Sequence, residues 1–142
     1  MMKPKIKKIL VPLDGSKNSF KGLNEAIYLA RQCGATITGL CVIPLYTVNL
    51  GRFLTPLKKE NEKEVKKFMR EAKRIAAQNG IVFYEKILYR NEVWEITDFA
   101  SSKKFDIIII SSRGLGAIKE AFLGSVANAI VHKSKIPVLV VK

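Results

Sequence analysis

The chain has 142 residues, of which 48% are hydrophobic, and a formal net charge of +13 at pH 7. This size allows one domain with a proper core and is too small for two domains of ordinary size. No apolar run approaches the roughly 20 residues of a membrane span, and the amino-terminal residues lead directly into a strand instead of a signal-peptide core. We therefore expect a single domain over residues 1–142 that is cytoplasmic and has no membrane partner.

The basic charge and the two cysteines do not by themselves indicate a nucleic acid partner, a disulfide framework or a metal site. A charge of +13 attracts polyanions in general, yet it fits a solvated lysine-rich surface equally well. No aromatic and basic recognition motif accompanies the charge, so we expect weak, salt-sensitive binding to DNA or RNA and no specific nucleic acid partner. Cys33 and Cys41 are too isolated from other ligand types for a disulfide framework or metal site. Both are expected to pack as small hydrophobic side chains.

The first half of the chain predicts a strand, a helix and a second strand. Residues 6–11 are expected to form a first strand, and residues 12–16 contain the Asp, Gly and Ser that suit a bend into a helix. From about residue 18 apolar side chains recur at helical spacing, and Gly34 is placed to end the helix. Residues 35–43 show little alternation of polarity, as expected of a strand covered on both faces.

The middle of the chain predicts a long connection, two helices and a strand. Residues 45–57 lack periodicity and exceed the usual connection length, which makes them a candidate lid or partner contact. Residues 58–74 carry one apolar stripe within a run of Lys and Glu, which is typical of a helix with a solvated face. Residues 81–88 alternate like a strand near an edge. Asn91 is suited to cap the next helix, in which Trp94 is expected to pack in the core or between the helix and the sheet.

The last part of the chain predicts a buried strand, a glycine loop, a helix and an edge strand. The unbroken isoleucines of residues 107–110 are typical of a central strand that is buried on both faces. Ser125 is expected to cap a helix that buries Val126, Ile130 and Val131, and residues 136–141 form the closing strand. Five strands alternating with four helices predict an α/β fold, a three-layer sandwich with a five-stranded parallel sheet and helices on both faces. Loops at the carboxyl ends of its strands should carry the function.

The loop Ser111-Ser112-Arg113-Gly114-Leu115-Gly116 is the strongest functional signal. Glycine lets backbone N–H groups approach a ligand, and the following helix adds unpaired N–H groups and its positive dipole end. Such a loop suits an anion, and phosphate fits best. The sequence after the first strand lacks the P-loop pattern, and the glycine loop lacks the third glycine of the dinucleotide fingerprint. The loop is therefore interpreted as a looser phosphate site.

Catalytic machinery is not evident in the sequence. His132 is the only histidine and falls in the last turn of the final helix, where an imidazole suits the helix dipole. There is no second histidine, no thiol beside a base and no cluster of carboxylates. Neither a nucleophilic triad nor a metal hydrolase can be assembled, so we expect no catalytic residues and no metal-ligating residues.

Over essentially its full length the chain resembles the universal stress proteins of the adenine-nucleotide alpha-hydrolase-like fold. Their signature is Gly, two residues, Gly, nine residues, then Gly followed by Ser or Thr. Gly114, nine intervening residues and Gly124-Ser125 match this spacing, while Ser111 replaces the opening glycine. Residues 8–16 are similar to the first strand and turn of the family, and residues 136–141 resemble its usual ending.

This resemblance implies a strand order of 3-2-1-4-5, with ATP and Mg²⁺ bound across the first and fourth strands. It also implies a homodimer through the last strand, by way of Ile136, Val138 and Val140. The residues implied to face adenine and ribose are Pro12, Leu13, Asp14 and Val42. Those implied to hold ribose and phosphates are Ser111, Ser112, Arg113, Gly114, Leu115, Gly116, Ala117, Gly124, Ser125, Val126 and Ala127. The implied function is an ATP-binding stress-response or signalling module with at most slow ATP hydrolysis.

Three alternatives stay open at this point. A family member that has lost nucleotide binding would act as a dimeric interaction protein. Asp14 either contacts the ribose or adenine, or merely caps the first helix near Ser16. Ser111 costs little where φ is negative, whereas a positive φ would strain it by about 1–2 kcal/mol.

Overall fold

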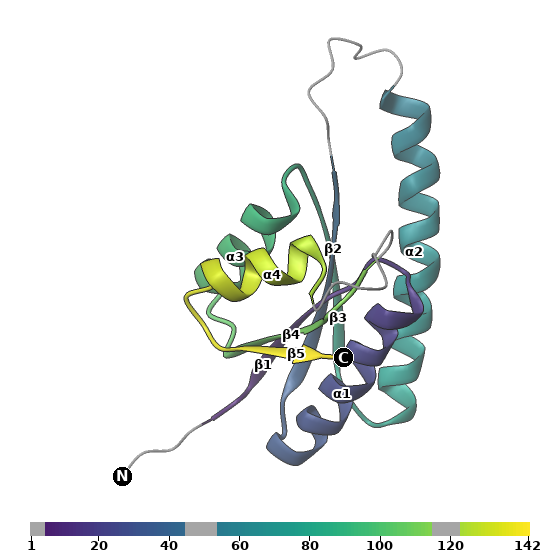
Figure 1. The fold of residues 1–142 in the computed structure, drawn as a ribbon. Coiled ribbons are helices and arrows are strands. Elements are labelled where there is room, and N and C mark those ends of the chain that lie inside the picture. Colours follow the sequence, from purple (N-terminus) through teal and green to yellow (C-terminus); the bar gives the residue numbers. More distant parts are fainter. Residues whose placement is uncertain (1–4, 45–53, 115–122) are drawn as a thin grey trace.

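The computed structural model describes residues 5–44, 54–114 and 123–142, with only the backbone described for residues 54–61 (Figure 1). Strands and helices alternate along the chain, which confirms the predicted α/β pattern. The elements are β1 (Lys8–Pro12), α1 (Lys17–Cys33), β2 (Thr36–Ile43), α2 (Leu54–Gln78), β3 (Phe83–Tyr89), α3 (Glu92–Ser102), β4 (Ile107–Ser111), α4 (Ser125–Lys133) and β5 (Val138–Val141). No helix in the described part of the chain is long and apolar enough to cross a membrane.

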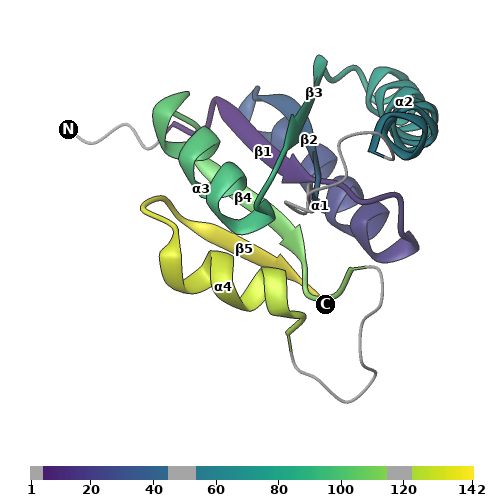
Figure 2. The same cartoon turned by 90° about the horizontal axis from the view of Figure 1, so that it is seen from above.

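The five strands form one parallel sheet in the order β3-β2-β1-β4-β5. Helices α1 and α2 cover one face of the sheet, and α3 and α4 cover the other (Figure 2). The predicted three-layer sandwich and the strand order 3-2-1-4-5 are therefore confirmed. The chain runs outward from β1 in one direction and from β4 in the other, so the carboxyl ends of these two strands mark the topological switch point.

The core is divided by the sheet into two apolar layers. Ile9 and Val11 of β1 pack toward α1 and α2, whereas Leu10 packs toward α3 and α4, because successive side chains of a strand point to opposite faces. In β4 every residue after Ile107 is buried, which confirms the predicted central position. The strands β3 and β5 lie at the edges, as their patterns predict.

Side chains and glycines begin and end the helices near the predicted positions. The Ser16 hydroxyl oxygen accepts a hydrogen bond from the Ser19 N–H at 3.1 Å and caps α1. Gly34 ends α1 in the left-handed conformation, with φ of 68°. The Asn91 side chain accepts from the Trp94 N–H at 2.9 Å, which confirms the predicted cap of α3.

Helix α2 is longer than the sequence predicts. It begins at Leu54, so residues 54–57 belong to a helix and not to the connection before it. Pro56 lies in the first turn, where a missing N–H leaves no helical hydrogen bond unmade. The remainder of the predicted connection, residues 45–53, lies outside the described residues.

Some residues predicted to be buried are exposed. Trp94 is 61% exposed and Val131 is 41% exposed, and Cys33 also faces solvent. On α3 the buried residues are Ile96 and Ala100, one turn apart, and a residue two positions before Ile96 points to the opposite side of the helix. The burial of Trp94 and Val131 was predicted because these side chains are apolar, but the prediction did not take into account which side of the helix they occupy.

Gly39 in β2 gives a test of the packing between β2 and β3. A Cβ at residue 39 would lie 2.4 Å from Cζ of Phe83 and 3.1 Å from Cδ1 of Leu13. We expect Gly39→Ala to lower the free energy of unfolding by about 1–3 kcal/mol through overpacking, measured by urea denaturation. Phe83→Leu removes the ring atom at this contact, so the double variant should lose less stability than the two single variants together. Additive losses would contradict this account of the glycine.

Candidate functional site

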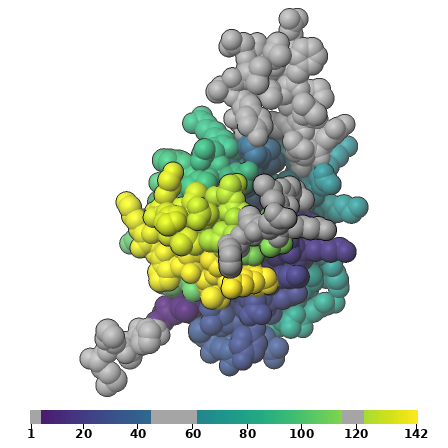
Figure 3. All heavy atoms as spheres, in the orientation of Figure 1, coloured from purple at the N-terminus to yellow at the C-terminus, as the bar shows by residue number. Residues whose placement is uncertain are grey.

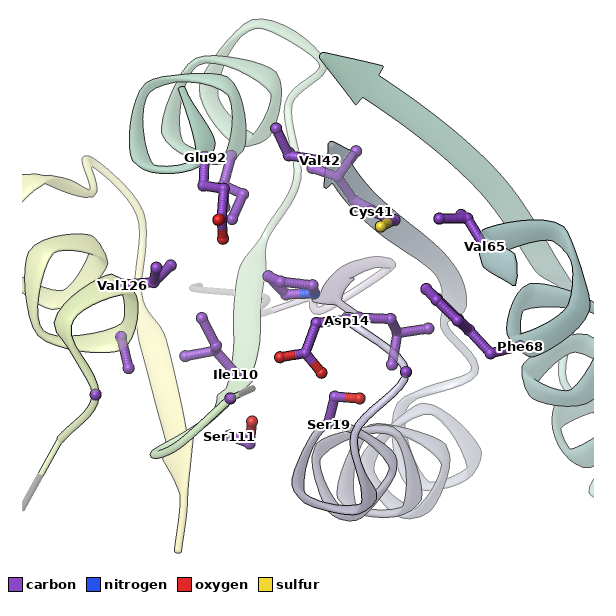
Figure 4. Close-up of a pocket in the computed structure, with 18 of the residues that line it drawn as sticks. Asp14, Ser19, Cys41, Val42, Val65, Phe68, Glu92, Ile110, Ser111 and Val126 are labelled. Atoms are coloured by element: carbon purple, nitrogen blue, oxygen red, sulfur yellow. The ribbon is translucent and has the colours of Figure 1, made fainter. Parts of the chain in front are cut away.

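A cavity of about 1080 Å³ lies at the carboxyl ends of β1, β2 and β4. Figure 4 shows that its walls come from both faces of the sheet, with α3 and α4 on one side and α2 on the other. The turn between β1 and α1 lies between these two sides. This is the place where open α/β sheets bind ligands, so the cavity is the candidate functional site.

The structure brings most of the predicted site residues together around this cavity. Arg113 belongs to the loop after β4 but does not line the cavity, and Leu115, Gly116 and Ala117 lie outside the described residues. The predicted residues that do line it are Pro12, Leu13, Asp14, Val42, Ser111, Ser112, Gly114, Gly124, Ser125, Val126 and Ala127. Segments from both ends of the chain therefore meet at one site.

The turn after β1 is held by the side chain of Asp14. Its Oδ1 atom accepts a hydrogen bond from the Ser16 N–H at 2.9 Å, while Gly15 adopts a positive φ of 85°. The turn also packs closely below α2, because a Cβ at Gly15 would lie 2.8 Å from Cδ2 of Phe68. Asp14 thus orders the start of α1 and lines the cavity at the same time.

The second carboxylate oxygen of Asp14 lies against the glycine loop. A Cβ on Gly114 would approach Oδ2 of Asp14 to 2.5 Å, closer than real Cβ atoms come to any neighbour. A side chain at residue 114 would therefore require the Asp14 carboxylate to move, and glycine at this position is not explained by a positive φ. The two segments that the sequence marks as functional are in direct contact.

Ser111 fits the loop without backbone strain. It does not appear among the described residues with positive φ, and its buried hydroxyl donates a hydrogen bond to the Arg113 carbonyl oxygen at 2.7 Å. The next residue, Ser112, donates its N–H to the carbonyl oxygen of Val141 at 2.7 Å, which ties the loop to the end of β5. Of the two alternatives for residue 111, the one in which a serine causes little strain because φ is not positive is therefore confirmed.

Helix α4 begins at the cavity, and its N-cap residue makes no side-chain capping bond. The predicted cap is wrong by one residue: Gly124 is the N-cap, and Ser125 is the first helical residue. Gly124 lacks a capping side chain, and its own N–H donates to the Ser112 carbonyl oxygen at 2.5 Å. The first turn of α4 lines the cavity with Ser125, Val126 and Ala127, so the positive end of the helix dipole faces it.

Glu92 is a cavity residue that the sequence interpretation missed. It is the first residue of α3, and its carboxyl group points into the cavity (Figure 4). Burial raises the pKa of Glu92, and the negative charge of Asp14 raises it further. One feature of the sequence could have identified Glu92 as a site residue: it lies four residues before Ile96 and therefore on the face of α3 that packs inward.

Cys41 shares the electrostatic environment of these carboxyl groups. Burial raises the pKa of the Cys41 thiol to about 12, with smaller contributions from the charges of Asp14 and Glu92. No group of three or more His, Cys, Asp or Glu residues suitable for a metal ion occurs among the residues that the structure describes. The predicted hydrophobic role of Cys41 agrees with its burial.

Helix α2 supplies a wall that was not predicted as part of the site. Val65 and Phe68 face the cavity, and the Tyr89 hydroxyl at the end of β3 forms a hydrogen bond with the Glu62 carboxylate of α2. The sequence shows that α2 has an apolar stripe. It does not show that Val65 and Phe68 are the residues of this stripe that line the cavity.

These features define a doubly wound α/β protein with a ligand-sized cavity at the switch point of its sheet. The model of the universal stress protein family matches residues 5–142, and the chain belongs to this family. Universal stress protein YxiE of Bacillus subtilis is 31% identical over 153 residues, covering 95% of this chain and 98% of that protein. The structure of UspA from Lactobacillus plantarum has the same fold, with a TM-score of 0.91 and 24% identity over 97% of this chain and 99% of that chain.

Similar solved structures include complexes with nucleotides. A universal stress protein in complex with cAMP has a TM-score of 0.76 and 25% identity, covering 96% of this chain and 97% of that chain. The universal stress protein from Archaeoglobus fulgidus in complex with dAMP has a TM-score of 0.75 and 25% identity, covering 96% of this chain and 98% of that chain. Both bound molecules are adenine nucleotides.

The contrast between the two thiols gives a test of the cavity wall. At pH 8 only a minute fraction of Cys41 is thiolate, because its pKa is raised to about 12, whereas Cys33 is exposed. We expect a chromogenic disulfide reagent to label one thiol rapidly in the folded protein and the second only after unfolding. Cys33→Ser should remove the rapid phase. Rapid labelling of Cys41 in folded Cys33→Ser would contradict the burial of this wall.

Proposed function

We propose that this protein binds ATP in the cavity between the ends of β1 and β4 and acts as a nucleotide-sensitive stress-response or signalling module. One observation carries the proposal: the first turn of α4, whose N-cap makes no side-chain capping bond, and the turn that contains Asp14 line the same cavity. Membership of the universal stress protein family and the bound cAMP and dAMP in similar structures support an adenine nucleotide as the ligand.

The two parts of the cavity suit the two ends of a nucleotide. Pro12, Leu13 and Val42 offer apolar contacts at the strand ends for the base. The first turn of α4 offers N–H groups for the phosphates. Mg²⁺ fits this arrangement as an ion held mainly by the ATP phosphates and water, since Mg²⁺ commonly needs only one or two protein carboxylates.

Slow turnover is the most that we propose for ATP hydrolysis. His132 lies in the last turn of α4 and is exposed, and it does not line the cavity. The carboxyl groups that line the cavity belong to Asp14, Glu64, Glu71 and Glu92. Asp14 already serves the turn before α1, and Glu71 is paired with Arg74. The proposed role is therefore a response to nucleotide binding, and not a metabolic turnover of ATP.

Asp14 gives the sharpest test of nucleotide binding. Asp14→Asn retains an oxygen for the Ser16 N–H but loses the second acceptor, so it should keep the wild-type melting temperature and weaken ATP binding about tenfold. Calorimetry with adenosine, which has no phosphate charge, should show the same loss. Asp14→Ala should lose stability as well, because it also removes the bond to Ser16.

The outcomes distinguish the ligand contact from the capping role. Unchanged ATP affinity in both Asp14 variants, together with a lower melting temperature for Asp14→Ala, would assign Asp14 to the turn alone. A wild-type protein that binds no adenine nucleotide would contradict the proposed function. The alternative, a dimeric interaction protein without a nucleotide, would then be favoured.

We also propose that the protein forms a homodimer through β5. The outer edge of β5 has no partner strand among the described residues, and its sequence from Val138 to Val141 contains no charge. The opposite edge strand, β3, exposes Glu85 and Lys86, which oppose edge-to-edge pairing. Helix α4 and β5 form a continuous part of the surface in Figure 3.

The predicted interface residues also contribute to the fold. Ile136, Val138 and Val140 pack partly against the layer of α3 and α4, so a charge at these positions would also destabilise the monomer. Leu139 is 41% exposed and is the better position for a test of dimerisation.

We expect Leu139→Lys to shift the protein from dimer to monomer, because it puts a positive charge beside its own copy at the shared edge. Light scattering at micromolar concentration measures the mass. Tyr84→Lys makes the same change at an exposed site on the opposite edge strand and should leave the dimer intact. A wild-type monomer, or equal effects of both variants, would contradict assembly through β5.

A further inference from the structure

The backbone before α3 fixes the position of Glu92. Strand β3 pairs with β2 up to Tyr89, and the next residue, Arg90, donates its N–H to the Ile43 carbonyl oxygen at 3.1 Å. Arg90 has a positive φ of 107°, which turns the chain abruptly toward the Asn91 cap. Glu92 therefore enters α3 directly above the end of the sheet.

Glu92 lies at the end of the inward-facing stripe of α3. Glu92, Ile96 and Ala100 follow one another at intervals of four residues, and both Ile96 and Ala100 are buried in the core. The position thus belongs to a face that is otherwise apolar. Its carboxyl group extends past the core into the cavity, from the side of α3 toward Asp14 and Ile110 (Figure 4).

Most of the labelled side chains around Glu92 in the cavity are apolar, namely Val42, Ile110 and Val126, while the Asp14 carboxylate adds a second negative charge (Figure 4). Among the described residues Glu92 is the only charged side chain that α3 and α4 contribute to the cavity. A carboxyl group in an apolar wall is costly unless hydrogen-bond donors meet it. The described residues supply no hydrogen bond or ion pair to this side chain. A ligand with donor groups would satisfy it.

We propose that Glu92 determines base specificity by accepting a hydrogen bond from the exocyclic amino group of adenine. The inference rests on the proposed function, in which the base contacts Val42 and the phosphates lie toward the glycine loop and α4. Glu92 lies near Val42, at the end of the cavity away from Ser111 (Figure 4). Guanine has a carbonyl oxygen where adenine has its amino group, so two acceptors would face each other and binding would weaken.

The test compares ATP with GTP by calorimetry at pH 8, where the carboxylate form of Glu92 is favoured. We expect wild-type protein to prefer ATP by about tenfold or more. Glu92→Gln keeps the shape of the side chain but offers both an amide donor and a carbonyl acceptor, so the preference should fall to less than about threefold. The loss should come from stronger GTP binding relative to ATP.

Glu95→Gln is the matched control. Glu95 is the other acidic residue in the first turn of α3, and it does not line the cavity. Its substitution changes the charge near the helix dipole in the same way, so it should leave the ratio of ATP to GTP affinity at the wild-type value. Circular dichroism of both variants checks that α3 is retained.

Each outcome decides between distinct hypotheses. ATP binding with an unchanged ATP to GTP ratio in Glu92→Gln would overturn the specificity role and leave the proposed function intact. A change confined to the ratio of ATP to dATP would assign Glu92 to the ribose and also overturn base recognition. The absence of nucleotide binding in wild-type protein would overturn both the proposed function and this inference.

Discussion

The contact between the Asp14 carboxylate and the backbone at Gly114 is the constraint on which the site depends. One oxygen of Asp14 holds the turn before α1, and the other occupies the space that a Cβ at residue 114 would need. Two segments 100 positions apart are thereby joined at the switch point of the sheet. A side chain at 114 would require the Asp14 carboxylate to leave this position. The glycine that the sequence suggests for ligand access thus also makes room for a contact within the protein.

The cavity has a positive region and a negative region, which the net charge of the chain does not reveal. The chain carries +13, and this field favours the approach of anions from solution. Inside the cavity the positive end of α4 lies on one side, while Asp14 and Glu92 place acidic groups elsewhere. Burial raises the pKa of Glu92, and the negative charge of Asp14 raises it further. A nucleotide, with anionic phosphates at one end and hydrogen-bond donors at the other, matches such a division.

The fold was predictable because its signals are strong and local. The unbroken isoleucines of residues 107–110 require burial on both faces, and alternating strands and helices leave few topologies. Helical phase was harder to read, since Trp94 and Val131 are apolar yet lie away from the sheet. The segments of the site followed from glycine spacing and family resemblance. Glu92 did not, because its role depends on how far the inward stripe of α3 extends beyond the sheet, and no local sequence pattern encodes that distance.

Ser111 illustrates how a departure from a family signature can be absorbed by the structure. Its hydroxyl bonds to the Arg113 carbonyl oxygen within the loop, and its backbone needs no left-handed conformation. The space restrictions instead fall on Gly114, beside Asp14, and on Gly124, where a Cβ would lie 3.3 Å from the Ser112 carbonyl oxygen. Both of these glycines are retained. Because the replaced position tolerates a side chain, the departure from the signature gives no steric reason to expect a change in the shape of the loop.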